Sequence, residues 1–126
     1  MKKKSIDEII KQYETSGKLM YEATLSGDYK TNNKEGAKLL KIYKLFEEDL
    51  ELAKECIPIL LNNENVVLQT EAAAYCLALR INTKCAEKKL EEIGNDSNNG
   101  IFGFNAKMTL QVWKEKGELT IYQHKK

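Results

Sequence analysis

The segment from Pro58 to Leu77 constrains the fold more than any other part of this chain. An apolar end at residues 59–61 meets a polar turn at residues 62–65, and apolar side chains then recur at helical spacing. Small side chains in the second half would let a neighbouring helix approach closely; they are Ala72, Ala73, Ala74 and Ala78. The pattern predicts two consecutive helices that form a scaffold, and it contains no set of residues that names a reaction.

Length and composition indicate one small domain without a strong global charge. The chain has 126 residues, of which 42% are hydrophobic, and this is enough for one core without metals or disulfides. We therefore expect a single domain over residues 1–126, with disordered ends at 1–4 and 120–126. Charged residues nearly cancel to a formal net charge of +1, so we do not expect a nucleic-acid partner drawn by overall charge.

The cysteines and the hydropathy pattern predict a cytoplasmic location. Cys56, Cys76 and Cys85 are odd in number and lack a C-x-x-C spacing, which indicates reduced thiols. No stretch approaches the roughly 18 apolar residues of a membrane helix. The basic first residues run directly into an amphipathic pattern rather than into the apolar run of a secretory signal. We expect no membrane contact.

Hydrophobic periodicity and capping signals predict about six helices. Their expected ranges are about 6–26, 33–49, 50–61, 66–80, 83–94 and 105–116. Two capping boxes support the first two helices: Ser5 with Glu8, and Asn32 with Glu35. Glycines mark three of the expected ends, and they are Gly27, Gly94 and Gly117.

The segment 102–112 fits both a strand and a helix. Its apolar residues alternate with polar or glycine positions as in a strand, and yet Ala106, Leu110 and Trp113 also fit a helix. We choose a helix over residues 105–116, because a lone strand has no partner with which to pair. The predicted fold class is therefore all-α, with about six helices in antiparallel pairs that form a HEAT-like helical repeat or a compact bundle.

Three short motifs between residues 33 and 117 carry a family resemblance. They are Pro58-x-Leu60-Leu61, Val67-x-x-x-x-Ala72-Ala73 and Gly103-Phe104-Asn105-Ala106-x-Met108-x-Leu110-x-x-Trp113. In these motifs the chain resembles a family of short bacterial HEAT-like proteins that carry a domain-of-unknown-function label. The resemblance implies a HEAT-like fold and the role of an immunity protein, which binds a cognate bacterial toxin and blocks it. The chain departs from the HEAT pattern at Leu68 and Gln69, where an arginine usually follows the valine.

Residue types that carry catalysis do not converge in the sequence. The single histidine, His124, lies two residues from the end of the chain and has no nucleophile beside it. Cys56 and Cys76 fall on predicted inward faces, where small buried thiols are common. No spacing of Cys, His or Asp side chains matches a metal site. We expect no catalytic residue, no cofactor and no metal, and hence a protein that is not an enzyme.

Two charged patches are the candidate binding surfaces. Lysines recur at helical spacing along the second predicted helix, at Lys34, Lys38, Lys41 and Lys44. Acidic side chains crowd around the turn that follows, at Glu47, Glu48, Asp49, Glu51 and Glu55. Either patch could be only a solvated helix face. As binding surfaces, the acidic residues could fill the basic cleft of a nuclease, whereas the lysines could contact nucleic acid or an acidic protein.

A second candidate for partner contact is Phe102. We expect Ile101, Phe102 and Phe104 to cover one end of the core, but an exposed Phe102 would be an anchor for a partner. The sequence thus predicts an immunity protein that neutralises a cognate toxin through the acidic residues and Phe102. The alternative is a nucleic-acid-binding or adaptor module that uses the lysines. We expect a monomer or a weak homodimer.

Overall fold

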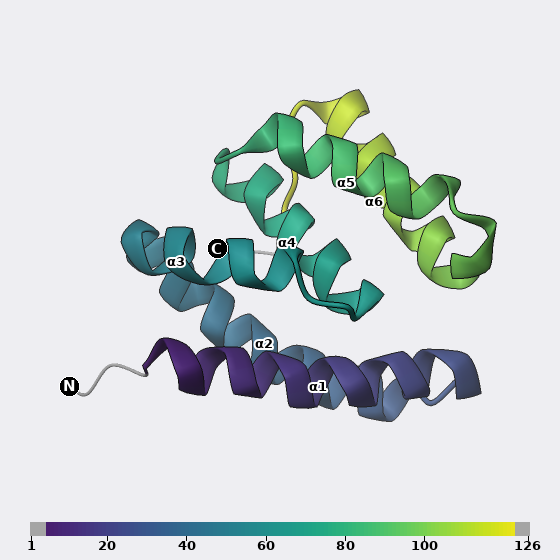
Figure 1. The fold of residues 1–126 in the computed structure, drawn as a ribbon, viewed down its shortest axis with the longest axis horizontal. Coiled ribbons are helices and arrows are strands. Elements are labelled where there is room, and N and C mark those ends of the chain that lie inside the picture. Colours follow the sequence, from purple (N-terminus) through teal and green to yellow (C-terminus); the bar gives the residue numbers. More distant parts are fainter. Residues whose placement is uncertain (1–4, 123–126) are drawn as a thin grey trace. The chain divides into compact units, whose positions relative to one another are not determined.

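The computed structural model describes residues 5–122, and this part of the chain is helical. It contains no strand, and its elements are α1 (Ile6–Ser26), α2 (Tyr29–Glu48), α3 (Leu50–Leu61), α4 (Val66–Leu79), α5 (Thr83–Asn95), the short 3-10 helix η1 (Ser97–Asn99) and α6 (Ile101–Lys116) (Figure 1). The all-α prediction is confirmed, as is the choice of helix for the ambiguous segment. None of these helices is both long and apolar enough to span a membrane. The predictions for residues 1–4, 123–126 and His124 lie outside the described residues.

The chain divides into two compact units, and the boundary lies inside α4. Unit 1 ends at Leu68 and unit 2 begins at Gln69, so the polypeptide passes from one to the other within a helix. The expectation of one domain over residues 1–126 stays a prediction, and an experiment that tests it is given in the Discussion.

In unit 1, α1 and α2 run side by side in opposite directions, and α3 contacts both (Figure 1). The capping box that begins α1 is confirmed, since the Glu8 amide donates to Ser5 Oγ at 3.2 Å and the Ser5 amide donates to Glu8 Oε1 at 3.0 Å. Gly27 ends α1 with φ of +77°, a conformation that glycine adopts without a steric penalty. Both ends of α1 therefore follow from local signals in the sequence.

The predicted start of α2 is wrong. The helix begins at Tyr29 rather than after Asn32, because the Asp28 side chain accepts a hydrogen bond from the Thr31 amide at 3.1 Å and caps the helix. Asn32 lies inside the helix, and its side-chain amide donates to Thr24 Oγ1 of α1 at 3.1 Å. The connection between α1 and α2 is consequently only two residues long.

The core of unit 1 is built around two aromatic side chains. The rings of Tyr13 and Phe46 stack with centroids 6.4 Å apart and planes inclined by 7°, and both side chains are fully buried. The other buried apolar residues of this unit are Ile9, Ala23, Leu39, Ile42, Tyr43, Ala53, Cys56, Ile57, Leu60, Leu61 and Leu68. The buried face of α3 passes through Ile57, and Ile59 is exposed.

A glycine in α1 permits close contact with the first turn of α4. Gly17 is buried, and a Cβ atom there would lie 2.8 Å from the side chain of Leu68. Leu68 itself is fully buried. The absence of a side chain at Gly17 thus makes room for Leu68 in the core of unit 1.

In unit 2, α5 and α6 pack against each other through two glycines. A Cβ at Gly103 would lie 3.1 Å from the Ile93 carbonyl oxygen, and one at Gly94 would lie 2.6 Å from Cγ of Lys107. The prediction that Gly94 stops α5 is therefore wrong. The helix continues to Asn95, and Gly94 is a point of close approach between helices.

The other boundaries in unit 2 agree in part with the sequence. Gly117 ends α6 with φ of +70°, as predicted, but α6 begins at Ile101 rather than Asn105. The start of α5 at Thr83 agrees with the expected range, and the side chain of the preceding Asn82 makes no capping hydrogen bond. The buried apolar residues are Ala72, Ala73, Tyr75, Cys76, Leu77, Ala86, Leu90, Ile93, Phe102, Ala106 and Leu110.

One end of unit 2 is held by an arginine and a tryptophan. The Arg80 guanidinium lies 5.4 Å from the centroid of the Trp113 ring, and its Nη2 donates to the Gly117 carbonyl oxygen at 2.7 Å. Trp113 Nε1 donates to Glu87 Oε2 of α5 at 2.8 Å. These contacts join the end of α4, α5 and the end of α6, which gives Arg80 a structural role.

Candidate functional site

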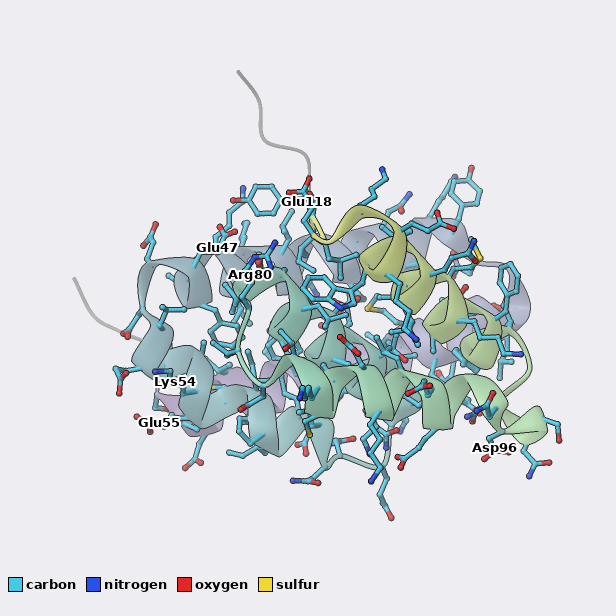
Figure 2. The ribbon with its side chains drawn as sticks, turned by 90° about the horizontal axis from the view of Figure 1, so that it is seen from above. Glu47, Lys54, Glu55, Arg80, Asp96 and Glu118 are labelled. Atoms are coloured by element: carbon cyan, nitrogen blue, oxygen red, sulfur yellow. The ribbon has the colours of Figure 1, made fainter. Side chains whose placement is uncertain are left out.

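Five acidic residues surround the corner where α2 ends and α3 begins. We call them the acidic ridge: Glu47, Glu48, Asp49, Glu51 and Glu55. Asp49 is half-buried and the other four are exposed. Figure 2 shows Glu47 from α2 and Glu55 from α3 at the same end of unit 1, with Lys54 near Glu55. The predicted acidic residues thus flank the turn between α2 and α3.

Two members of the ridge stabilise the start of α3. Asp49 Oδ1 accepts a hydrogen bond from the Leu52 amide at 3.2 Å and caps the helix, and Glu51 lies in its first turn, where a negative charge is favourable. The ion pair of Glu51 with Lys54 is 3.6 Å long between side chains that are more than half exposed, so it adds little to stability. Asp49 therefore has a structural role whether or not it also contacts a partner.

Three charged residues in the end turns of α2 oppose its helix dipole, although the Asp28 cap agrees with it. A helix favours negative charge near its N-terminus and positive charge near its C-terminus, by about 0.3–1 kcal/mol for each group. The first turn of α2 contains Lys30 and no acidic residue, and the last turn contains Glu47 and Glu48 and no basic residue. The dipole of α2 therefore disfavours these three charges.

The predicted row of lysines follows the exposed side of α2. We call it the lysine face, with Lys30 included: Lys30, Lys34, Lys38, Lys41 and Lys44, all of which are exposed. Lys38 Nζ also forms an ion pair with Glu35 Oε2 at 3.0 Å. The lysine face and the acidic ridge are both parts of unit 1.

A buried carboxylate between α1 and α2 was not recognised from the sequence. Glu35 is only 3% exposed, and it accepts hydrogen bonds from Ser16 Oγ at 2.8 Å and from Lys38 Nζ at 3.0 Å. Ser16 in turn accepts one from Gln12 Nε2 at 2.8 Å. The hydrogen bond from Ser16 and the charge of Lys38 lower the pKa of Glu35 from its ordinary value of 4.5, although burial acts in the opposite direction. This network is a polar link between two helices.

A signal for this position does exist in the sequence. Glu35 precedes Leu39 by four residues and Ile42 by seven, so it lies on the apolar side of the helix. An acidic residue at a core position is expected to have partners, because an unpaired buried charge is unfavourable.

Glu35→Gln should reduce stability in a way that depends on pH. Hydrogen bonds to a charged group contribute about 1.5–3 kcal/mol, so at pH 7 we expect a loss of about 1–3 kcal/mol. Because the pKa of Glu35 is lowered in the folded state, its contribution is complete above the ordinary value of 4.5 and disappears as the pH falls through the lower folded value. Urea unfolding of both proteins over this pH range measures the difference.

The difference in stability between the wild type and Glu35→Gln reports the titration of Glu35 alone, because the other carboxyl groups are the same in both proteins. Hydrogen bonds with Thr31 lower the pKa of Asp28, whereas burial raises that of Glu71 against a hydrogen bond with Tyr75, and both are common to the two proteins. The exposed Glu22→Gln is a matched control, with an expected change within about 0.5 kcal/mol. A loss in Glu35→Gln that stays constant with pH would show that the ionised carboxylate is not the stabilising group.

The structure places the Phe102 side chain in the core. It is 6% exposed, whereas Phe104 is 61% exposed and Ile101 is also exposed. The prediction that Phe102 covers the core is confirmed, and the same prediction for Ile101 and Phe104 is wrong. A buried ring does not offer its surface to a partner, so Phe102 is not retained among the candidate contact residues.

The buried thiols have the properties of packing residues. Burial, with a smaller effect of a neighbouring Glu55, raises the pKa of Cys56 to about 11, and burial also raises the pKa of Cys76 to about 11. Thiols of this kind are protonated near neutral pH and are poor nucleophiles. Cys85 is exposed in the first turn of α5. Within residues 5–122 no group of His, Cys, Asp and Glu side chains is arranged to hold a metal ion.

A groove of about 420 Å³ lies in unit 2 between α5 and α6. Its lining residues are Leu90, Glu91, Asn95, Lys107, Leu110, Gln111, Lys114 and Glu115. The two lysines and two glutamates give it no net charge, and Gln111 Nε2 donates to Glu115 Oε2 at 2.9 Å. These side chains do not converge on a reacting centre, so the acidic ridge stays the leading candidate site.

The comparisons with known proteins add no relative to this description. Searches against protein-family models, curated proteins and solved structures found no match to the chain.

Proposed function

We propose that this protein is a non-catalytic immunity protein, which binds a cognate bacterial toxin in a one-to-one complex and blocks it. The acidic ridge would be the main contact surface, and the toxin would present a basic patch to it. The observation that carries the proposal is the presence of four exposed carboxylates around the turn between α2 and α3, namely Glu47, Glu48, Glu51 and Glu55. The resemblance of three sequence motifs to short bacterial HEAT-like proteins of a domain-of-unknown-function family implies the same role.

The electrostatics of the ridge support a binding role over a purely structural one. Glu47 and Glu48 lie where the dipole of α2 disfavours them, and an exposed pair such as Glu51 and Lys54 stabilises the fold little. Several carboxylates at one corner would instead attract a basic surface and accelerate its association. The protonated thiols of Cys56 and Cys76 support packing roles rather than chemistry.

Reversing two ridge charges should weaken toxin binding without unfolding the protein. In the double variant Glu48→Lys and Glu51→Lys we expect the association rate to fall about tenfold or more, because exposed interface charges act mainly on association. Glu48→Lys also places a cation at the C-terminus of α2, which the helix dipole favours. Surface plasmon resonance with a candidate toxin, sought among the products of adjacent genes, measures the rates, and survival in co-expression reports neutralisation.

A matched control separates the ridge from net charge. Glu91→Lys with Glu92→Lys changes the total charge equally, at two exposed residues of α5 in unit 2, and should leave association unchanged. Survival with both double variants would remove the ridge from the interface. Death of cells that carry the wild-type protein would contradict the immunity proposal for that toxin.

A further inference from the structure

The lysine face and part of the acidic ridge form one continuous strip on α2. Residues 30, 34, 41, 44 and 48 recur at helical spacing and share one side of the helix. Lys44 precedes Glu48 by four residues, which is about 6 Å along the helix axis. The sign of the charge therefore reverses within about one turn.

A partner of ordinary size cannot cover the ridge without reaching the lysines. A specific interface buries about 800 Å² on each partner, which corresponds to a patch roughly 30 Å across. The 20 residues of α2 span about 30 Å. A surface centred on Glu48 and Glu51 therefore extends over Lys41 and Lys44, and a partner that was basic throughout would meet like charges there.

We infer that the toxin that binds the acidic ridge also presents an acidic patch, which docks on the lysine face of α2. This inference rests on the proposed function and deepens it. The contact is bipolar, with carboxylates of the partner opposite Lys41 and Lys44, and its basic groups opposite Glu48 and Glu51. Lys34 follows next along the same side of α2. The order of charges along α2 fixes the direction in which the partner lies, because the opposite orientation juxtaposes like charges at both ends.

The same geometry argues against nucleic acid on the lysine face. A phosphate backbone carries only negative charge, and a strand that follows α2 from Lys30 to Lys44 reaches Glu47 and Glu48 at the end of the helix. The ion pair with Glu35 also neutralises part of the charge of Lys38. A protein with two patches of opposite sign matches the whole strip, whereas a polyanion matches only one part.

The decisive variant reverses the lysine face and leaves the ridge intact. Lys34→Glu with Lys41→Glu avoids Lys38 and its ion pair, and the matched control is Lys84→Glu with Lys88→Glu, at exposed residues of α5. We expect the lysine-face variant to associate with the toxin about tenfold more slowly than the wild type, and the control to associate at the wild-type rate. Circular dichroism melts of all proteins establish that they remain folded.

A pair of peptides tests the bipolar strip without the toxin. One peptide carries a block of lysines followed by a block of glutamates, and the other has the same composition in alternating order. At low ionic strength the wild-type protein should bind the blocked peptide several-fold more tightly, and reversal of either the lysines or the ridge should abolish the preference. Equal binding of the two peptides would overturn the inference.

The outcomes distinguish the inference from the function on which it rests. If the ridge variant loses toxin binding while the lysine-face variant keeps the wild-type rate, the bipolar contact is overturned and the immunity proposal stands. If the wild-type protein does not bind the toxin, the proposed function fails. If the lysine face instead binds a single-stranded oligonucleotide with a steep salt dependence that Lys34→Glu and Lys41→Glu remove, the face is a nucleic-acid site and the inference is overturned.

Discussion

Leu77→Ala should lower the free energy of unfolding by about 2–5 kcal/mol, because the substitution leaves a cavity in a closely packed region. Leu77 is fully buried in α4, and Ala72, Ala73 and Tyr75 of the same helix are buried as well. The alanine side chains have no rotamers with which to fill the space. Urea unfolding followed by far-ultraviolet circular dichroism measures the change.

An exposed leucine gives the matched control for this measurement. Leu25 is 63% exposed near the end of α1, so Leu25→Ala should change stability by no more than about 0.5 kcal/mol. A loss below that value in Leu77→Ala would mean that the inward face of α4 has been assigned wrongly.

Phe46→Ala should have a comparable or larger effect, about 3–5 kcal/mol. Phe46 is fully buried in unit 1, and its loss removes both the buried area of the ring and the stacking with Tyr13. Phe104→Ala is the control, since that ring is 61% exposed. Equal losses in the two phenylalanine variants would contradict the assignment of the core.

The Leu77 and Phe46 variants together test whether the chain unfolds as one domain. The two residues lie in different units. If residues 1–126 form a single cooperative domain, each substitution should shift the same transition, with probes of both units changing together. If unfolding instead shows two transitions, and each substitution shifts only one of them, the expectation of one domain is contradicted.

Local signals in the sequence were sufficient for several helix ends. The Ser5 and Glu8 capping box and the terminal glycines Gly27 and Gly117 were read correctly, because each depends on hydrogen bonds or backbone conformations within a few residues. The same kind of signal failed for Asn32 and Glu35. Their spacing fits a capping box, but it also fits two positions inside a helix, and the side chain of Asp28 caps α2 earlier.

The sequence was sufficient to name the residues of the candidate site, but not to establish how they are arranged. The ridge residues could be named because acidic side chains crowd around one predicted turn. Their exposure, the capping role of Asp49 and the opposition of Glu47 and Glu48 to the helix dipole required the position of the helix ends. Glu35 escaped notice because its partner Ser16 lies 19 residues away.

By itself the sequence determined that the chain is helical and where most of its helices lie. It also determined that the turn between α2 and α3 is acidic. These features depend on periodicity and capping, which act over one or two helical turns. The tertiary structure alone decided that Phe102 is buried while Phe104 is exposed, and that Gly94 and Gly103 lie where α5 and α6 approach each other closely. An apolar residue or a glycine is compatible with several environments. Its burial depends on which distant segment packs against it, and short-range patterns do not encode that contact.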